Sequence, residues 1–281
     1  MAASGRRLDQ WLVAHGYAET RSRAQWLIET GQVWVRGQPC RKPSLMLPDA
    51  CQVEIRGEGL PYVSRGGLKL EWALQAFGVD VVGLVALDIG ASTGGFTDCL
   101  LQRGAQRVYA LDVGSGQLAL RLRDDPRVIA LEGRNVRTFQ AAELPEAVDL
   151  ITVDVSFISL TLVLPRLPPF LRPCGRVVAL VKPQFEVGTE HVRRGGIVRD
   201  PHRRELAVPR VMLAAAEAGF RVLQATEAPG APPYGNREIL IDLNWAAERA
   251  AVTVRNAPIP VHRTSPGIAP GEKGCYAARS Q

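Results

Sequence analysis

The sequence LDIGASTGGFTD, residues 87–98, sets the expected fold, because it passes from an apolar strand through a glycine-rich loop into a helix. Gly90, Gly94 and Gly95 allow tight backbone turns and the close approach of a ligand. Their spacing differs from the G-x-G-x-x-G pattern of dinucleotide-binding proteins. A glycine turn at this place is also common without a ligand, so the meaning of this loop depends on the rest of the chain.

Apolar strand candidates alternate with helical segments over most of the chain. Helix-like segments lie at residues 95–103, 160–171 and 201–218. Continuous apolar strands alternating with helices predict an α/β fold with a mostly parallel sheet covered on both faces. The strand candidates are residues 84–90, 107–114, 128–133, 147–157, 176–185, 221–229 and 238–245.

The patterning also predicts where the domains begin and end. Residues 5–57 combine two short helices, at 7–15 and 20–31, with short strands at 33–35 and 52–55, which indicates a small α+β domain. The predicted organisation is a domain at residues 5–57, a linker at 58–62, the α/β domain at 63–246 and a largely disordered tail at 247–281. A short helix at 246–251 is a possible exception to the disorder.

The composition limits the classes of partner that we expect for this chain. The net charge of +6 favours an acidic partner, nucleic acid first, although an arginine-rich composition can also reflect genome base content. Five cysteines without a C-x-x-C pair and four scattered histidines predict neither a disulfide framework nor a metal site, and suit the cytoplasm. No apolar run reaches the roughly 18–20 residues of a membrane helix, and the first residues lack a signal-peptide core, so we expect no membrane partner.

Two acids and a lysine follow predicted strands at positions suited to chemistry. Asp112 ends its strand roughly 20 residues past the glycine loop, where an acid can accept hydrogen bonds from both hydroxyls of a ribose. A solvent-facing capping aspartate is the alternative. Asp154 and Lys182 end two later strands, and such carboxyl ends border the ligand crevice of an open parallel sheet.

Lysine is rare in this chain, with 4 residues among 34 basic ones, and two of the four lie near these ends. Lys69 precedes the first strand, and Glu238 opens the last one. A partly desolvated lysine beside another cation can act as a base near neutral pH, whereas arginine stays protonated. An ordinary ion-pair network remains the alternative.

Several of these motifs together resemble a known family. The segments SRGGLKL, DIGASTGGFTD, ALDVG, VALVKPQFE, GGIVRD and NREILI resemble the TlyA family of ribosomal RNA 2′-O-methyltransferases, also called haemolysins, whose catalytic domain is similar to FtsJ-type methyltransferases. Residues 7–37 resemble the S4-type RNA-binding module. The resemblance covers residues 5–245 and implies a Rossmann-like methyltransferase sheet, mostly parallel with its last strand antiparallel, behind a small RNA-binding domain.

The resemblance also implies a reaction and its residues. A tetrad of Lys69, Asp154, Lys182 and Glu238 would transfer a methyl group from S-adenosylmethionine to the ribose of a cytidine in ribosomal RNA, within a ribosomal subunit. The implied cofactor residues are Gly90, Ala91, Ser92, Gly94, Gly95, Phe96, Asp112, Val113, Asn135 and Val136.

Basic side chains are expected to hold the RNA through its phosphates. For any single arginine, a solvated charged face is the alternative. Two other functions stay open for the whole chain: a ribosome-assembly factor that binds ribosomal RNA without catalysis, and a nucleotide-dependent oxidoreductase on the same fold. The expected RNA-binding residues are Arg6, Arg7, Arg21, Arg23, Arg36, Arg41, Lys42, Arg65 and Arg199.

Overall fold

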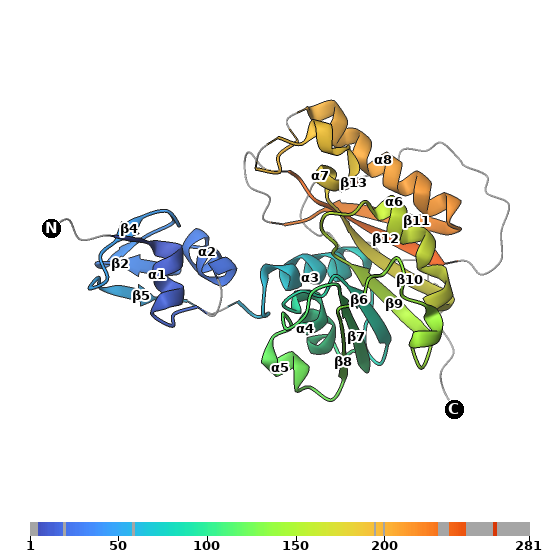
Figure 1. The fold of residues 1–281 in the computed structure, drawn as a ribbon, viewed down its shortest axis with the longest axis horizontal. Coiled ribbons are helices and arrows are strands. Elements are labelled where there is room, and N and C mark those ends of the chain that lie inside the picture. Colours follow the sequence, from blue (N-terminus) through green and yellow to red (C-terminus); the bar gives the residue numbers. More distant parts are fainter. Residues whose placement is uncertain are drawn as a thin grey trace. The chain divides into compact units, whose positions relative to one another are not determined.

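The chain divides into two compact units, Met1–Gly67 and Leu68–Gln281, in a computed structural model (Figure 1). The structure describes residues 5–18, 21–57, 60–193, 195–198, 200–229, 236–245 and 261–262.

The first unit packs two helices beside short strands. Leu8, Leu12 and Ile28 are fully buried in its core, which explains the apolar spacing of the two predicted helices. The two predicted strands are also present, whereas β1, β3 and β4 escaped prediction because two residues carry no periodicity. The elements are β1 Arg6–Arg7, α1 Leu8–Ala14, α2 Arg21–Glu29, β2 Val33–Val35, β3 Gln38–Pro39, β4 Met46–Leu47 and β5 Val53–Ile55.

The second unit is built on one sheet with the order β13-β11-β12-β10-β9-β6-β7-β8. Strands β10, β9, β6, β7 and β8 pair in parallel, and β12 runs antiparallel to both β10 and β11. This confirms the mostly parallel sheet with its last predicted strand reversed. The strands are β6 Val85–Ile89, β7 Arg107–Asp112, β8 Val128–Glu132, β9 Val148–Val153, β10 Leu171–Val181, β11 Phe220–Glu227, β12 Ile239–Trp245 and β13 Val261–His262.

Strand β13 comes from the segment expected to be a disordered tail. Its two residues pair in parallel with β11. The rest of that segment, and the short helix considered at 246–251, lie outside the described residues.

Helices cover both faces of the sheet (Figure 1). The single helix predicted at 160–171 is wrong: α6 ends at Val163 and two 3₁₀ turns follow, Leu164–Arg166 and Pro168–Phe170. Pro165, Pro168 and Pro169 lack the amide donors that an α-helix needs. The α-helices are α3 Arg65–Phe77, α4 Gly95–Gln102, α5 Leu120–Arg123, α6 Leu160–Val163, α7 Pro183–Glu186 and α8 Pro201–Glu217.

Side chains alternate between the two faces of the sheet. Ile89, Val153 and Val181 belong to the apolar core that Val211 of α8 also joins. Toward the carboxyl ends of these strands, even-numbered residues face α3 and α4, as Asp88 does when it accepts a hydrogen bond from Thr97 of α4. Because of this alternation, charged side chains that follow neighbouring strands can lie on the same face of the sheet.

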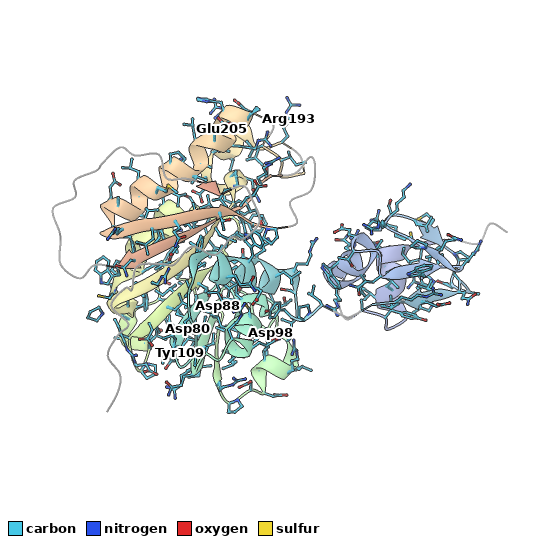
Figure 2. All side chains as sticks on the ribbon, turned by 180° about the vertical axis from the view of Figure 1, so that it is seen from behind. Asp80, Asp88, Asp98, Tyr109, Arg193 and Glu205 are labelled. Atoms are coloured by element: carbon cyan, nitrogen blue, oxygen red, sulfur yellow. The ribbon has the colours of Figure 1, made fainter. Side chains whose placement is uncertain are left out.

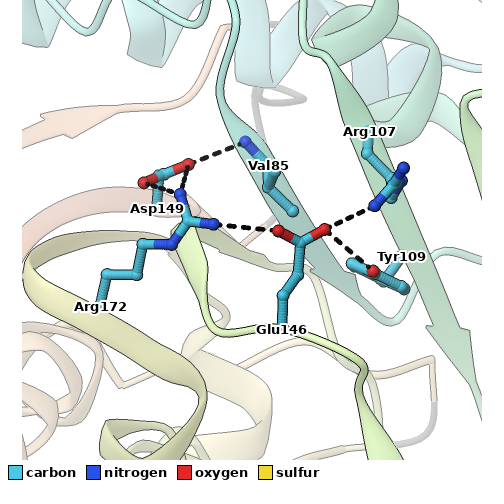
Figure 3. Close-up of polar contacts among 6 residues, drawn as sticks. All are labelled: Val85, Arg107, Tyr109, Glu146, Asp149 and Arg172. Carbon is cyan, nitrogen blue, oxygen red and sulfur yellow. Dashed lines mark hydrogen bonds and ion pairs between the residues drawn. The ribbon is translucent and has the colours of Figure 1, made fainter. Parts of the chain in front are cut away.

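The amino ends of the parallel strands are tied by an ion-pair network (Figure 3). Arg172 Nη1 lies 2.9 Å from Asp149 Oδ1, and its Nη2 lies 3.0 Å from Glu146 Oε2. Arg107 Nη1 donates to Glu146 Oε1 at 2.6 Å. These charges satisfy one another at the end of the sheet opposite to the glycine loop. We therefore expect the catalytic residues at the carboxyl ends of the parallel strands, where open parallel sheets bind their ligands.

Candidate active site

The glycine loop leaves β6 at its carboxyl end and enters α4. Gly90 has φ of 83°, and a Cβ there would lie 2.5 Å from the backbone oxygen of Asp154. Gly94 caps α4 with φ of 96°, and a Cβ there would collide with Leu122 and Leu118. Both positions therefore favour glycine for backbone conformation, and Gly90 also requires it for packing against the backbone of Asp154.

Asp112 connects this loop to the turn after β7. Its Oδ2 accepts a hydrogen bond from the amide of Ser92 at 2.8 Å, and its Oδ1 accepts one from the amide of Gly114 at 2.7 Å. Each carboxylate oxygen can accept more than one hydrogen bond, so Asp112 can still bind ribose hydroxyls. Its neighbour Val113 is 68% exposed beside it.

The other predicted cofactor residues divide by burial. Ser92 and Asn135 are exposed, and Asn135 Oδ1 accepts from the amide of Arg137 in a local turn. Phe96 and Val136 are 3% and 5% exposed and offer a ligand little surface. Ala91, Gly94 and Gly95 are buried in the loop itself.

Asp88 is a buried acid behind the loop that the sequence prediction missed (Figure 2). Its two oxygens accept hydrogen bonds from Thr97 Oγ1 at 2.7 Å and from Thr152 Oγ1 at 2.8 Å. Burial raises the pKa of Asp88 to about 6, against these hydrogen bonds and with a further push from the charge of Asp154. The available signal was a lone acid inside the apolar strand VALDI.

The four predicted tetrad residues form two ion pairs. Lys182 Nζ lies 2.6 Å from Asp154 Oδ1 and donates a hydrogen bond to Ser156 Oγ at 3.0 Å. Asp154 Oδ1 is buried and has no hydrogen-bond partner among the described residues, so its contact with Lys182 is electrostatic. Lys69 Nζ donates to Glu238 Oε2 at 2.5 Å. All four side chains are between 11% and 24% exposed.

The sheet explains why both pairs lie at one rim. Val181 of β10 is the register partner of Ile239 of β12, so Lys182 and Glu238 are the next residues beyond that pair. Lys182 keeps an extended backbone, which continues the alternation. Asp154, Lys182 and Glu238 thus face the side of the sheet covered by α3, which carries Lys69.

Comparisons with known proteins show the family of this chain. The FtsJ-like methyltransferase family model matches residues 62–245, and the S4 domain model matches residues 6–49. The 16S/23S rRNA (cytidine-2′-O)-methyltransferase TlyA of Mycobacterium tuberculosis is 42% identical over 258 residues, which cover 92% of this chain and 96% of that protein. The chain belongs to the TlyA family.

Other proteins similar to this TlyA-family chain carry a different name. Hemolysin A of Brachyspira hyodysenteriae is 40% identical over 83% of this chain and 98% of its own length. A solved structure from Streptococcus thermophilus that carries a hemolysin name is 41% identical, with a TM-score of 0.69 over 88% of this chain and 90% of that one. None of the helices in the described ranges is long and apolar enough to span a membrane.

The basic residues of the first unit differ in what they contact. Arg6, Arg36, Arg41 and Lys42 are exposed. Arg23 lies over the ring of Trp26 at 5.3 Å. Arg65 begins α3 and is 46% exposed, and Arg199 lies outside the described residues.

Arg7 and Arg21 share a buried acceptor, Asp9. Arg7 Nε and Arg21 Nε donate to its carboxylate at 3.0 and 2.9 Å, and Gln25 Nε2 donates at 3.0 Å. Burial acts to raise the pKa of Asp9, but the hydrogen bonds from Arg7, Gln25 and Arg21 outweigh it and hold the pKa well below its usual range. Arg21 and Gln25 therefore hold α2 to α1 through Asp9, and Arg7 adds a local contact at the start of α1.

Metal ligands do not gather anywhere in the part of the chain that the structure describes. Within those residues, no three histidine, cysteine, aspartate or glutamate side chains are placed to hold an ion together. The tetrad itself has two ammonium groups beside two carboxylates, a composition suited to moving a proton.

Proposed function

We propose that this TlyA-family chain transfers a methyl group from S-adenosylmethionine to the 2′-hydroxyl of a cytidine ribose in ribosomal RNA. The observation that carries the proposal is the pair of lysine–carboxylate contacts, Lys182 with Asp154 and Lys69 with Glu238, at the carboxyl-end rim of the sheet. The names of the TlyA relatives supply the nucleotide and the RNA class. A ribosomal RNA substrate also agrees with the cytoplasmic location that we expect from the composition.

The residues around the glycine loop fit the cofactor. Gly90 and Gly94 let the loop pack tightly against Asp154 and Leu122, which fixes the loop that would hold the cofactor. Asp112 would accept hydrogen bonds from the ribose of the cofactor. Bound S-adenosylmethionine would supply a methyl group on a positively charged sulfonium, from which a neutral thioether leaves. The remaining predicted contacts are Ala91, Ser92, Gly95 and Phe96 near the methionine part, and Val113, Asn135 and Val136 at the adenine.

The tetrad would handle the proton of the attacking hydroxyl. As the ribose oxygen bonds to the methyl carbon and the carbon–sulfur bond breaks, the hydroxyl proton must leave. Lys182 would receive or orient that proton, and Asp154 would hold the Lys182 amine in place. Lys69 and Glu238 would position the ribose. Holding both reactants in line supplies much of the acceleration.

RNA binding would rest first on the S4 unit. Its exposed Arg6, Arg36, Arg41 and Lys42 would contact phosphates, which positions an RNA without reading its sequence. Folded RNA is recognised by shape and exposed hydroxyls, so a structured element within an assembled subunit is a better substrate than a short oligomer.

Two alternative functions predict different results. A ribosome-assembly factor without catalysis would bind RNA and transfer no methyl group. A nucleotide-dependent oxidoreductase would use the glycine loop for nicotinamide nucleotides, yet this loop lacks the G-x-G-x-x-G spacing. That reading also leaves the Lys69–Glu238 contact without a role.

The decisive experiment uses the full chain with labelled S-adenosylmethionine and separated ribosomal subunits. Methyl label on one cytidine 2′-oxygen, mapped by mass spectrometry, is the expected result. Calorimetry should show binding of S-adenosylmethionine and none of a nicotinamide dinucleotide. Absence of label from both subunits, with RNA binding intact, would favour the assembly factor.

A further inference from the structure

Two chain segments run side by side away from the Asp154–Lys182 ion pair. One follows β9 from Asp154 to the start of α6, and the other follows β10 from Lys182 through α7. The first cross-link between them is the hydrogen bond from Lys182 Nζ to Ser156 Oγ, at 3.0 Å. It orients the Lys182 amine toward the 154–160 segment, in addition to the ion pair with Asp154 Oδ1, an atom with no hydrogen-bond partner among the described residues.

Glu186 makes the cross-link at the far end of the two segments. It is 2% exposed, its Oε2 accepts from Ser159 Oγ at 2.5 Å, and its Oε1 accepts from the amide of Leu160 at 2.9 Å. Its backbone oxygen accepts from Arg210 Nη1 of α8 at 2.8 Å. Glu186 thus binds the amino end of α6 to α7, and α8 holds α7 in turn.

The segment between these two cross-links is strained. Phe157 has φ of 65°, and its ring lies 5.3 Å from that of Phe185 while remaining 92% exposed. A bulky residue with positive φ is strained and persists only when its surroundings hold it. Released at the Glu186 end, this segment would relax, and Ser156 would move with it.

From these contacts we propose that Glu186 is a positioning residue, which anchors the 154–160 segment so that Ser156 orients the amine of Lys182. This inference rests on the proposed function only for its catalytic consequence. The structural part, a dependence of the Lys182 amine on Glu186, stands without it. Glu186 touches no reacting group, and it acts through the segment and Ser156.

The test measures the NMR signal of the Lys182 amine directly. The chain contains four lysines, so ¹⁵N-lysine labelling of the full chain gives few side-chain signals, and Lys182→Arg assigns the one of interest. We expect the Lys182 signal to shift in Ser156→Ala and to shift in the same direction in Glu186→Ala. Glu190→Ala is the matched control, because Glu190 is 67% exposed and lies four residues further along the chain, beyond α7.

Exchange and kinetics complete the experiment. Amide exchange of residues 154–162 should accelerate in Glu186→Ala, and Glu186→Gln, which can still accept from the Leu160 amide, should restore part of the protection. In methyl transfer, Glu186→Ala should lower kcat at least about tenfold with KM for RNA nearly unchanged. Combined with Ser156→Ala, its effect should be less than the product of the two single effects.

Clear outcomes would overturn the inference. An unshifted Lys182 signal in folded Glu186→Ala or Ser156→Ala protein would show that the anchor does not reach the amine. Effects on kcat that multiply fully would show that Glu186 and Ser156 act independently. A parent protein without methyl transfer would refute the proposed function instead, and the lysine signals would still decide whether Glu186 positions Lys182.

Discussion

Val181 and Ile239 are the last register partners between β10 and β12, and Lys182 and Glu238 follow directly beyond them. Because β12 runs antiparallel, its first residues lie at the carboxyl ends of the parallel strands. A parallel β12 would place Glu238 at the opposite end of the sheet, beside the Arg172 network. The reversal of one strand therefore brings the acid of one ion pair next to the lysine of the other.

The proton role of Lys182 is tested by Lys182→Arg. Arginine keeps the positive charge beside Asp154 but cannot release a proton near neutral pH. We expect methyl transfer to fall about 100-fold or more, the range that general acid–base groups supply. Calorimetry of S-adenosylmethionine binding is the control and should be unchanged. A variant as fast as the parent would mean that the position needs only a charge.

The close approach at the glycine loop is tested by Gly90→Ala. Gly90 has positive φ, and a Cβ there would meet the backbone oxygen of Asp154, which cannot rotate away. Gly78→Ala is the matched control, since Gly78 also has positive φ, 61°, but has open space around it. We expect Gly78→Ala to destabilise the protein by about 1 kcal/mol through backbone strain alone.

In urea unfolding, Gly90→Ala should lower the free energy of unfolding clearly more than the control does. It should also weaken S-adenosylmethionine binding. Equal losses of stability for the two variants would show that the contact with Asp154 relaxes without cost.

The buried acid Asp88 should make stability depend on pH. Its folded pKa of about 6 lies above the value of an unfolded aspartate, so the folded chain binds more protons between these two values. Stability should therefore fall as pH rises from about 4 to 6, by up to about 3 kcal/mol, and then level off. Asp88→Asn keeps an amide able to bond Thr97 and Thr152 and removes this slope.

Urea unfolding of parent and Asp88→Asn proteins at pH values across this window checks the expectation. The variant should gain stability relative to the parent as pH rises. Parallel curves for the two proteins would mean that Asp88 titrates normally in the folded chain.

The buried acid Asp9 should make stability depend on pH in the opposite direction. Its folded pKa is lowered, so its contribution is present above the unfolded pKa and lost as pH falls below about 4. Asp9→Asn should destabilise the first unit by roughly 1–3 kcal/mol at neutral pH, because Arg7, Arg21 and Gln25 lose a charged acceptor. Faster amide exchange in residues 8–29, with residues 85–181 unaffected, is the expected readout. Unchanged exchange in α1 and α2 would contradict the structural role of Asp9.

Local patterns in the sequence determined most of the architecture. Apolar runs placed the main strands, the glycine loop placed the start of α4, and the strand ends singled out Asp112, Asp154 and Lys182. These features depend on neighbouring residues, whose periodicity and turn chemistry are visible in the chain itself. The helix expected at 160–171 failed where three prolines interrupted a pattern that was otherwise helical.

The tertiary structure alone decided which charges meet. It paired Lys182 with Asp154 and Lys69 with Glu238, although the last two are 169 residues apart in sequence. It also buried Asp88 between two threonines and joined Glu186 to the start of α6. Such contacts depend on strand order, register and the alternation of faces, which arise only when distant strands pair, so no local pattern carries them.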